Sequence, residues 1–243
     1  MFSILEIPRK LQIVTAILIL SVSSTDAYSQ TDTILTSKSH KELTKVAVEQ
    51  ITKLESGTLL VMLHSRKNSI NALKKSGQTD LANSVRAKQE KLNKTLINAF
   101  NSVFNFCPVY FFMNDELPLV TNNELDRVTF LDNDLNPNKG IKPEVTYFLI
   151  CEYGNINSDP DAHFGHNYYD QTGKGLEKKS ANYTSTNFGF RALVISDQTS
   201  RQLRKPFPYY VKSNESISFD KNAVKMVKKL NSKLLKYYNR NND

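Results

Sequence analysis

Apolar residues recur along the chain in two patterns. Apolar positions spaced three to four residues apart, with Lys and Glu on the opposite face, predict helices over residues 38–55, 79–103 and 220–238. A shorter helix is expected between Asn68 and Ser76–Gly77, where the last two residues end it. Short continuous apolar runs are typical of buried strands, and they cover residues 58–64, 106–113, 128–131, 144–153 and 188–196.

These elements predict an α/β fold: a mixed β-sheet with helices on both faces. The run Thr58–His64 is apolar on both faces, so we expect it to lie at the centre of the sheet. The segment 205–211 contains Pro206 and Pro208, and we expect it to be an edge strand or a loop. The order of elements is compatible with a thioredoxin-like core, an analogy that carries no function.

The same patterns predict the hydrophobic core. Seven strand residues are expected to be nearly fully buried in one sheet, namely Leu59, Val61, Leu63, Val109, Phe111, Leu149 and Val194. Among the helical positions, Leu81 and Val224 are expected to begin the inward-facing stripes of two helices.

Residues 1–29 have the pattern of a cleavable secretory signal peptide. A basic pair precedes the apolar stretch Leu11–Val22, whose 12 residues are fewer than the about 20 that a membrane-spanning helix needs. Small residues at Ala27 and Ser29 place the cut before Gln30, and an uncleaved N-terminal anchor is the alternative. We expect residues 30–243 to form a single soluble α/β domain without a transmembrane segment, exported to the periplasm or beyond the cell.

The formal net charge of +8 is unevenly distributed. Residues 38–106 and 171–243 are basic, whereas residues 107–170 contain 3 Lys or Arg and 11 Asp or Glu. This distribution is typical of solvated, lysine-rich helix faces, and it also fits a basic face that meets an envelope component or another anionic surface. Export removes the chain from nucleic acid, so we expect no nucleic-acid partner.

Three sequence strings suggest a relationship. FNFCPVYFF, VTFLDNDL and FRALVISD, the last together with RQLRKPFPYYV, resemble a family of exported bacterial proteins of unknown function. The resemblance extends over most of residues 30–243. It implies export and a shared fold, and it assigns no reaction and no site residues.

The two cysteines, Cys107 and Cys151, each lie in an apolar, strand-like run. Buried thiols that behave as small hydrophobic groups are one interpretation. If the two strands are neighbours and the Cα atoms lie within about 4.4–6.8 Å, a disulfide can form in an oxidising compartment. Neither run offers a helix N-terminus or a cation that would stabilise a thiolate, so we expect no catalytic thiol.

The segment 159–166 has the densest group of potential metal ligands. Asp161, His163 and His166 could bind Zn²⁺ or another divalent ion. A closed zinc site needs four ligands and the H-E-x-x-H helix pattern is absent, so histidines on a surface loop are the alternative. We predict no other cofactor.

Two further segments have candidate polar sites. Arg66 and Lys67 lie between a predicted strand and a predicted helix, where they could bind an anion, although the glycines of a P-loop are absent and simple capping is the alternative. The segment Asp132–Asn138 resembles a Ca²⁺ loop in composition, but Pro137 replaces the required glycine. We therefore expect an Asx-rich turn there.

No motif in the chain specifies a reaction. A G-x-S-x-G nucleophile elbow is absent, and no pair of carboxylates stands out for acid–base chemistry. We therefore predict an exported, non-enzymatic module that binds a partner at the cell envelope. The alternative hypothesis is a thioredoxin-like thiol-redox protein that lacks the C-x-x-C motif.

Overall fold

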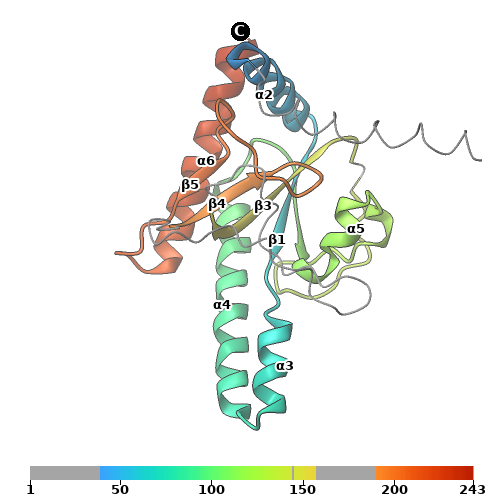
Figure 1. The fold of residues 1–243 in the computed structure, drawn as a ribbon, viewed down its shortest axis with the longest axis vertical. Coiled ribbons are helices and arrows are strands. Elements are labelled where there is room, and N and C mark those ends of the chain that lie inside the picture. Colours follow the sequence, from blue (N-terminus) through green and yellow to red (C-terminus); the bar gives the residue numbers. More distant parts are fainter. Residues whose placement is uncertain (1–38, 144, 157–189, 243) are drawn as a thin grey trace, which may run out of the picture. The chain divides into compact units, whose positions relative to one another are not determined.

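The computed structural model describes residues 39–143, 145–156 and 190–242 (Figure 1). The chain divides into two units, residues 1–43 and 44–243. The described part of the first unit opens helix α2 (His40–Glu55) with a capping box. The Ser39 N–H donates to Glu42 Oε2 at 2.8 Å and the Glu42 N–H donates to Ser39 Oγ at 3.3 Å, which satisfies two amide groups that the helix leaves unpaired.

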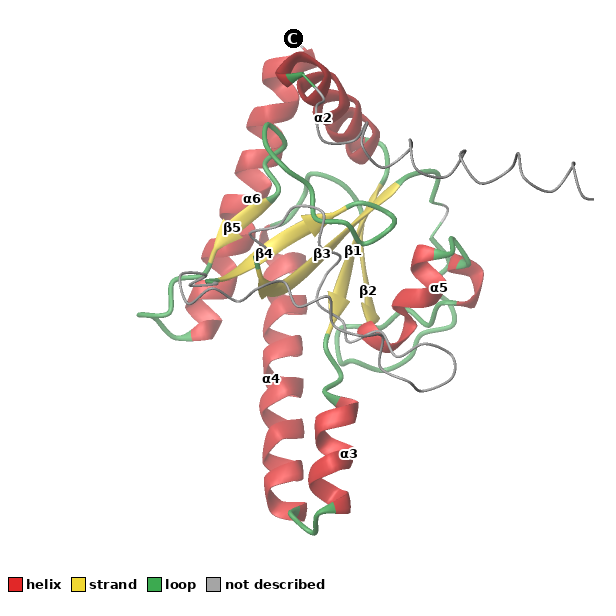
Figure 2. Ribbon diagram, viewed as in Figure 1, coloured by secondary structure: helices red, strands yellow, loops and turns green. Residues whose placement is uncertain are grey.

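The described part of the second unit contains a five-stranded sheet in the order β2-β1-β3-β4-β5 (Figure 2). The strands are β1 (Thr58–Leu63), β2 (Val109–Met113), β3 (Phe148–Asn155), β4 (Arg191–Ser196) and β5 (Tyr210–Lys212). β1 pairs in parallel with β2 and β3, whereas β4 is antiparallel to both β3 and β5. The predicted mixed α/β sheet is confirmed, and the thioredoxin-like core stays a prediction.

Helices cover both faces of this sheet. The remaining helices are α3 (Lys67–Lys75), α4 (Thr79–Val103), α5 (Leu117–Thr121) and α6 (Phe219–Asn242), with short 3₁₀ turns η2 (Asn114–Glu116) and η3 (Leu125–Arg127). Side chains of α2, α4 and α6 pack with one face of the sheet, and those of α5 pack with the other. None of the helices in the described ranges is long and apolar enough to cross a membrane.

The central position of β1 explains its continuous apolar run. Alternate residues point to opposite faces of a strand, so Val61 packs toward α2, α4 and α6 while Met62 packs toward α5. Val61 is 1% exposed. The predicted core is confirmed at six of its seven positions, and Val109 is only partly buried because β2 lies at the edge of the sheet.

The strand predicted over residues 128–131 is wrong. Val128 follows η3 directly, and Leu131 makes only isolated bridges, with Phe111 and Pro137. Val128 and Phe130 instead cover the second face of the sheet, where Phe130 is 1% exposed, whereas Leu131 packs into the core on the first face. The segment 205–211, predicted as an edge strand or a loop, is a loop through Tyr209, and the edge strand β5 begins at Tyr210, after both prolines.

Two predicted inward-facing residues lie at the surface. Leu81 is 49% exposed and Val224 is 39% exposed. Leu81 belongs to the first turns of α4, where this helix packs against α3 and both extend past the end of β1 (Figure 1). The helical period alone cannot reveal where a helix leaves the sheet, so the predicted stripes are wrong at these positions.

Strand direction determines which residues meet at one edge of the sheet. The parallel strands β1, β2 and β3 end at the same edge, where the chain continues into α3, into η2 and to Ile156. β4 is antiparallel and therefore begins at this edge, with Arg191 opposite Asn155. We call this edge the carboxyl rim.

Candidate functional site: a cationic pocket at the carboxyl rim

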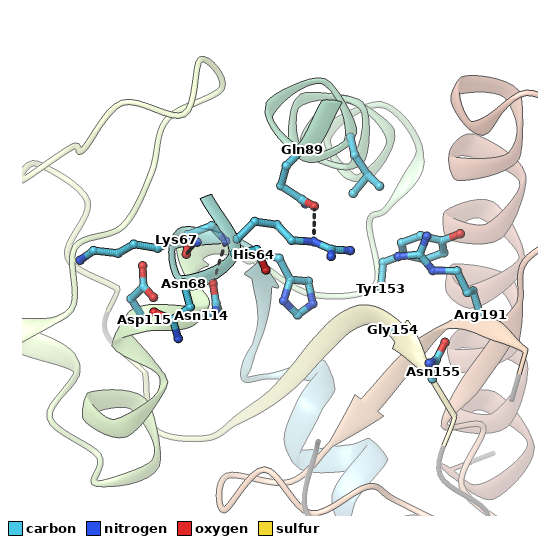
Figure 3. A pocket seen from close by; sticks show the side chains of 14 residues that line it. His64, Lys67, Asn68, Gln89, Asn114, Asp115, Tyr153, Gly154, Asn155 and Arg191 are labelled. Carbon is cyan, nitrogen blue, oxygen red and sulfur yellow. Dashed lines mark hydrogen bonds between the residues drawn. The ribbon is translucent and has the colours of Figure 1, made fainter. Parts of the chain in front are cut away.

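A cavity of about 640 Å³ lies at the carboxyl rim, and we call it the rim pocket (Figure 3). Its described lining comes from the residues that follow β1 and β2, from the end of β3, from the start of β4 and from one side of α4. Open α/β sheets bind ligands at the carboxyl edge, at the point where the strands that follow one strand in the chain are added on its two opposite sides. β1 is such a strand, because β2 and β3 flank it.

Arg66 is held in the rim pocket by a chain of buried amides. Its Nε donates to Gln89 Oε1 at 3.3 Å, shown dashed in Figure 3. Gln89 donates to Asn93 Oδ1 at 2.9 Å, and Asn93 donates to the carbonyl oxygen of His64 at 2.9 Å. Arg66 also has a φ of 54°, a left-handed conformation that disfavours residues with a Cβ atom. Such backbone strain is often found at functional sites.

The other predicted anion-binding residue has a different orientation. Lys67 contributes to the lining of the rim pocket, but its side chain points away from His64, on the side of Asp115 (Figure 3). The structure therefore places Arg66 and Lys67 in one cavity, as neighbours with divergent side chains.

Arg191 is a second guanidinium group in the rim pocket, and no pattern in the sequence singled it out. Its Cζ lies 4.6 Å from the ring centroid of Tyr153, a cation–π contact (Figure 3). The Tyr153 hydroxyl is 3.1 Å from Ser213 Oγ, which also accepts a hydrogen bond from Asn222 Nδ2 at 2.7 Å. This buried network fixes the aromatic surface on which Arg191 lies.

His64 and Glu152 form a pair that the sequence did not reveal. His64 Nε2 lies 3.5 Å from Glu152 Oε2, and the side chains are 30% and 7% exposed, respectively. Glu152 is on β3, between Met62 of β1 and Val194 of β4. A glutamate within the apolar run of this strand was the available signal, because a buried carboxylate needs a partner.

Gly154 makes room for the carboxylate of Glu152. The two residues lie on the same face of β3, since they are two positions apart. A Cβ atom on Gly154 would lie 2.9 Å from Glu152 Oε1. The absence of a side chain at Gly154 therefore allows the carboxylate to lie beside His64.

The charges of the described lining residues favour anions. Arg66, Lys67 and Arg191 carry positive charge, and Asp115 carries negative charge. Guanidinium groups bind phosphate and carboxylate through two parallel hydrogen bonds, which gives them directional preference for these anions. The rim pocket therefore has the chemistry of an anion site.

The two cysteines are free thiols. Cys107 lies just before β2 and Cys151 lies in β3, and β1 separates these strands. Two strand spacings amount to about 9.5 Å, more than a disulfide can bridge, so the disulfide considered from the sequence does not form. Burial raises the pKa of Cys107 to about 12 and also raises the pKa of Cys151, the opposite of what a reactive thiol requires.

The two candidate metal segments have different outcomes. Asp161, His163 and His166 lie outside the described residues, and within the described ranges no group of three or more His, Cys, Asp or Glu could hold a metal ion. Asp132 accepts the N–H groups of Asp134 at 2.8 Å and Asn136 at 2.9 Å. The Asx-rich turn is therefore confirmed, and these bonds, chiefly that from Asn136, lower the pKa of Asp132.

Comparison with known proteins adds no relative. No protein-family model, no curated protein and no solved structure matches the chain. The resemblance to exported bacterial proteins stays a prediction, and the functional conclusion rests on the geometry of the rim pocket.

Proposed function

We propose that the protein is an exported envelope protein that binds an anionic ligand in the rim pocket. One observation carries this proposal: Arg66 and Arg191 line one cavity, and buried side chains hold each of them in place. Arg66 is exposed and donates one hydrogen bond to Gln89, and Arg191 lies on the ring of Tyr153, so part of the entropy cost of ordering each side chain is met before a ligand binds.

The proposed ligand is an envelope component with phosphate or carboxylate groups. The signal-peptide pattern of residues 1–29 supports export, and the basic composition of residues 171–243 supports an anionic partner. The strained backbone of Arg66 supports a role beyond folding, because a left-handed residue with a Cβ atom costs free energy.

Calorimetric titration of the purified protein with inorganic pyrophosphate and phosphate tests this proposal. We expect Arg66→Ala and Arg191→Ala each to raise Kd by about tenfold or more, since a hydrogen bond to a charged group contributes about 1.5–3 kcal/mol. Arg240→Ala, on an exposed position of α6, is the matched control and is expected to leave Kd unchanged.

Two results would contradict the proposal. One is a wild-type protein that binds neither anion at low ionic strength, where electrostatic attraction is strongest. The other is an Arg240→Ala variant that loses as much affinity as Arg66→Ala, because binding would then follow overall charge. Circular dichroism melting of each variant checks that the fold is retained.

A further inference from the structure

The contact between His64 and Glu152 goes beyond anion binding. From it we propose that the rim pocket hydrolyses a phosphoric monoester, with His64 as the catalytic base and Glu152 as its positioning residue. This inference rests on the proposed function, because Arg66 and Arg191 must first bind the phosphoryl group.

The sheet itself does not need a carboxylate at position 152. Glu152 follows Ile150 on the same face of β3, and its side chain is 7% exposed. Burying a carboxylate costs free energy that an apolar side chain would avoid, even when a partner is present. Gly154 leaves the space that the carboxylate occupies, so two positions of one strand contribute to placing Glu152 beside His64.

A buried carboxylate beside an imidazole gives the ring a definite role. It fixes the orientation of the ring and the nitrogen that carries the proton, as in catalytic triads. Because Nε2 of His64 faces Glu152 Oε2, we assign Nδ1 as the nitrogen that exchanges the proton in the reaction. The separation of 3.5 Å is long for a hydrogen bond, and such contacts often tighten when substrate binds.

His64 and the guanidinium groups share one cavity. His64 is 30% exposed and lines the rim pocket together with Arg66 and Arg191. In Figure 3 the ring of His64 lies between Asn114, on one side, and Tyr153 with Arg191, on the other. Two guanidinium groups match the double negative charge of a phosphoric monoester, which is why we favour this substrate class.

The proposed reaction consumes one water molecule. Arg66 and Arg191 hold the phosphoryl oxygens, and His64 takes a proton from water as the water oxygen forms a bond to phosphorus. The bond between phosphorus and the ester oxygen breaks, and its electron pair stays on that oxygen. The leaving alkoxide, opposite the attacking water, takes a proton from solvent, and His64 releases its proton to solvent, so the products are an alcohol and inorganic phosphate.

Hydrolysis of p-nitrophenyl phosphate by the purified protein tests the inference. We expect His64→Ala to lower kcat by about 10²-fold or more, the usual contribution of acid–base catalysis, and added imidazole to restore part of the rate. Glu152→Gln is expected to lower kcat with little change in KM, and Glu152→Asp to retain more activity. Glu215→Gln, at an exposed loop position, is the matched control.

A second variant tests the positioning role of Glu152 without removing its carboxylate. In Gly154→Ala the new Cβ atom meets Glu152 Oε1, the far end of a flexible side chain, so the chain can fold while the carboxylate moves from His64. We expect a melting temperature close to wild type and a lower kcat. Full activity in this variant, with full activity in Glu152→Gln, would overturn the positioning role.

The outcomes separate the two proposals. If the wild-type protein binds pyrophosphate but hydrolyses p-nitrophenyl phosphate no faster than buffer does, the hydrolytic activity is wrong and anion binding stands. If neither binding nor hydrolysis is observed, both proposals are wrong. A His64→Ala variant that hydrolyses the ester at the wild-type rate would also overturn the catalytic role of His64.

Discussion

Burial controls the chemistry of several single residues in this protein. Cys151 is completely buried in β3, and Cys107 packs partly buried against the same core. Burial raises the pKa of the Cys107 thiol and that of the Tyr147 hydroxyl, each to about 12. The folded protein therefore keeps these groups neutral at pH values at which the unfolded chain ionises them.

From this difference we expect the free energy of unfolding to fall as the pH rises above about 9. An unfolded thiol ionises near pH 8.5, whereas folded Cys107 stays protonated up to about pH 12. A raised pKa in the folded state means that the stabilisation is fully present below about pH 8.5 and is lost as the pH rises toward 12. Urea unfolding at pH 8 and pH 10.5 measures the change.

Two controls accompany this measurement. A Cys107→Ala, Cys151→Ala variant is expected to show a smaller loss between the two pH values, because the two thiols no longer contribute. Alkylation at neutral pH without denaturant is expected to label neither cysteine quickly. Rapid labelling of Cys107 alone would contradict this and would favour the thiol-redox hypothesis.

Single residues of the site differ in how far the sequence could predict them. Arg66 lies between an apolar run and a helical pattern, so neighbouring residues in the sequence were enough to predict it as a candidate anion-binding residue. Glu152, His64 and Arg191 come together only through the strand order β1-β3-β4, which no local pattern contains. A carboxylate within an apolar run indicates a buried charge, but it does not indicate the partner.

At the scale of elements, β1 is the strand on which the sheet depends. Val61→Asp would place a charge among the side chains of α2, α4 and α6, where no water can solvate it. We expect the variant to lose most of a stability that is typically about 5–15 kcal/mol. Thermal unfolding followed by circular dichroism measures this loss.

Val224→Asp is the matched control for the same substitution. Val224 is 39% exposed on α6, so we expect a change in stability within about 0.5 kcal/mol. A Val61→Asp variant that melts at the wild-type temperature would show that β1 is not central. Equal destabilisation by both variants would point to a general effect of added charge.

The elements themselves could largely be predicted, because length and period distinguish long helices from short buried strands. α2, α4 and α6 have a regular period. β1 and β4 lie within continuous apolar runs, and β3 extends two residues beyond its run, to Asn155. The prediction was wrong for residues 128–131. An apolar run is also found in a segment that packs against a sheet without pairing with it as a strand. The helix α5 was missed because five residues are too few for a helical period to show.

For the molecule as a whole, export is the prediction with the broadest consequence. When the full chain is produced in a bacterium that exports it, we expect mass analysis of the product to find Gln30 at the N-terminus. Ser29→Phe is expected to block this cut, because the peptidase pocket accepts only small residues there. A product that retains Leu11–Val22 would contradict the prediction.

The position of the rim pocket also affects how this protein can change over evolutionary time. Most of its described lining residues come after the last core residue of a strand, whereas the side chains that hold the sheet together lie within the strands. Under the proposed function, substitutions at Ser65, Lys67 or Asn68 would alter the ligand preference of the rim pocket at little cost to stability. Selection can then change the specificity of such a scaffold while the fold is inherited unchanged. Tyr153 and Glu152 are exceptions, because each is buried within β3 and also contacts a residue that lines the rim pocket.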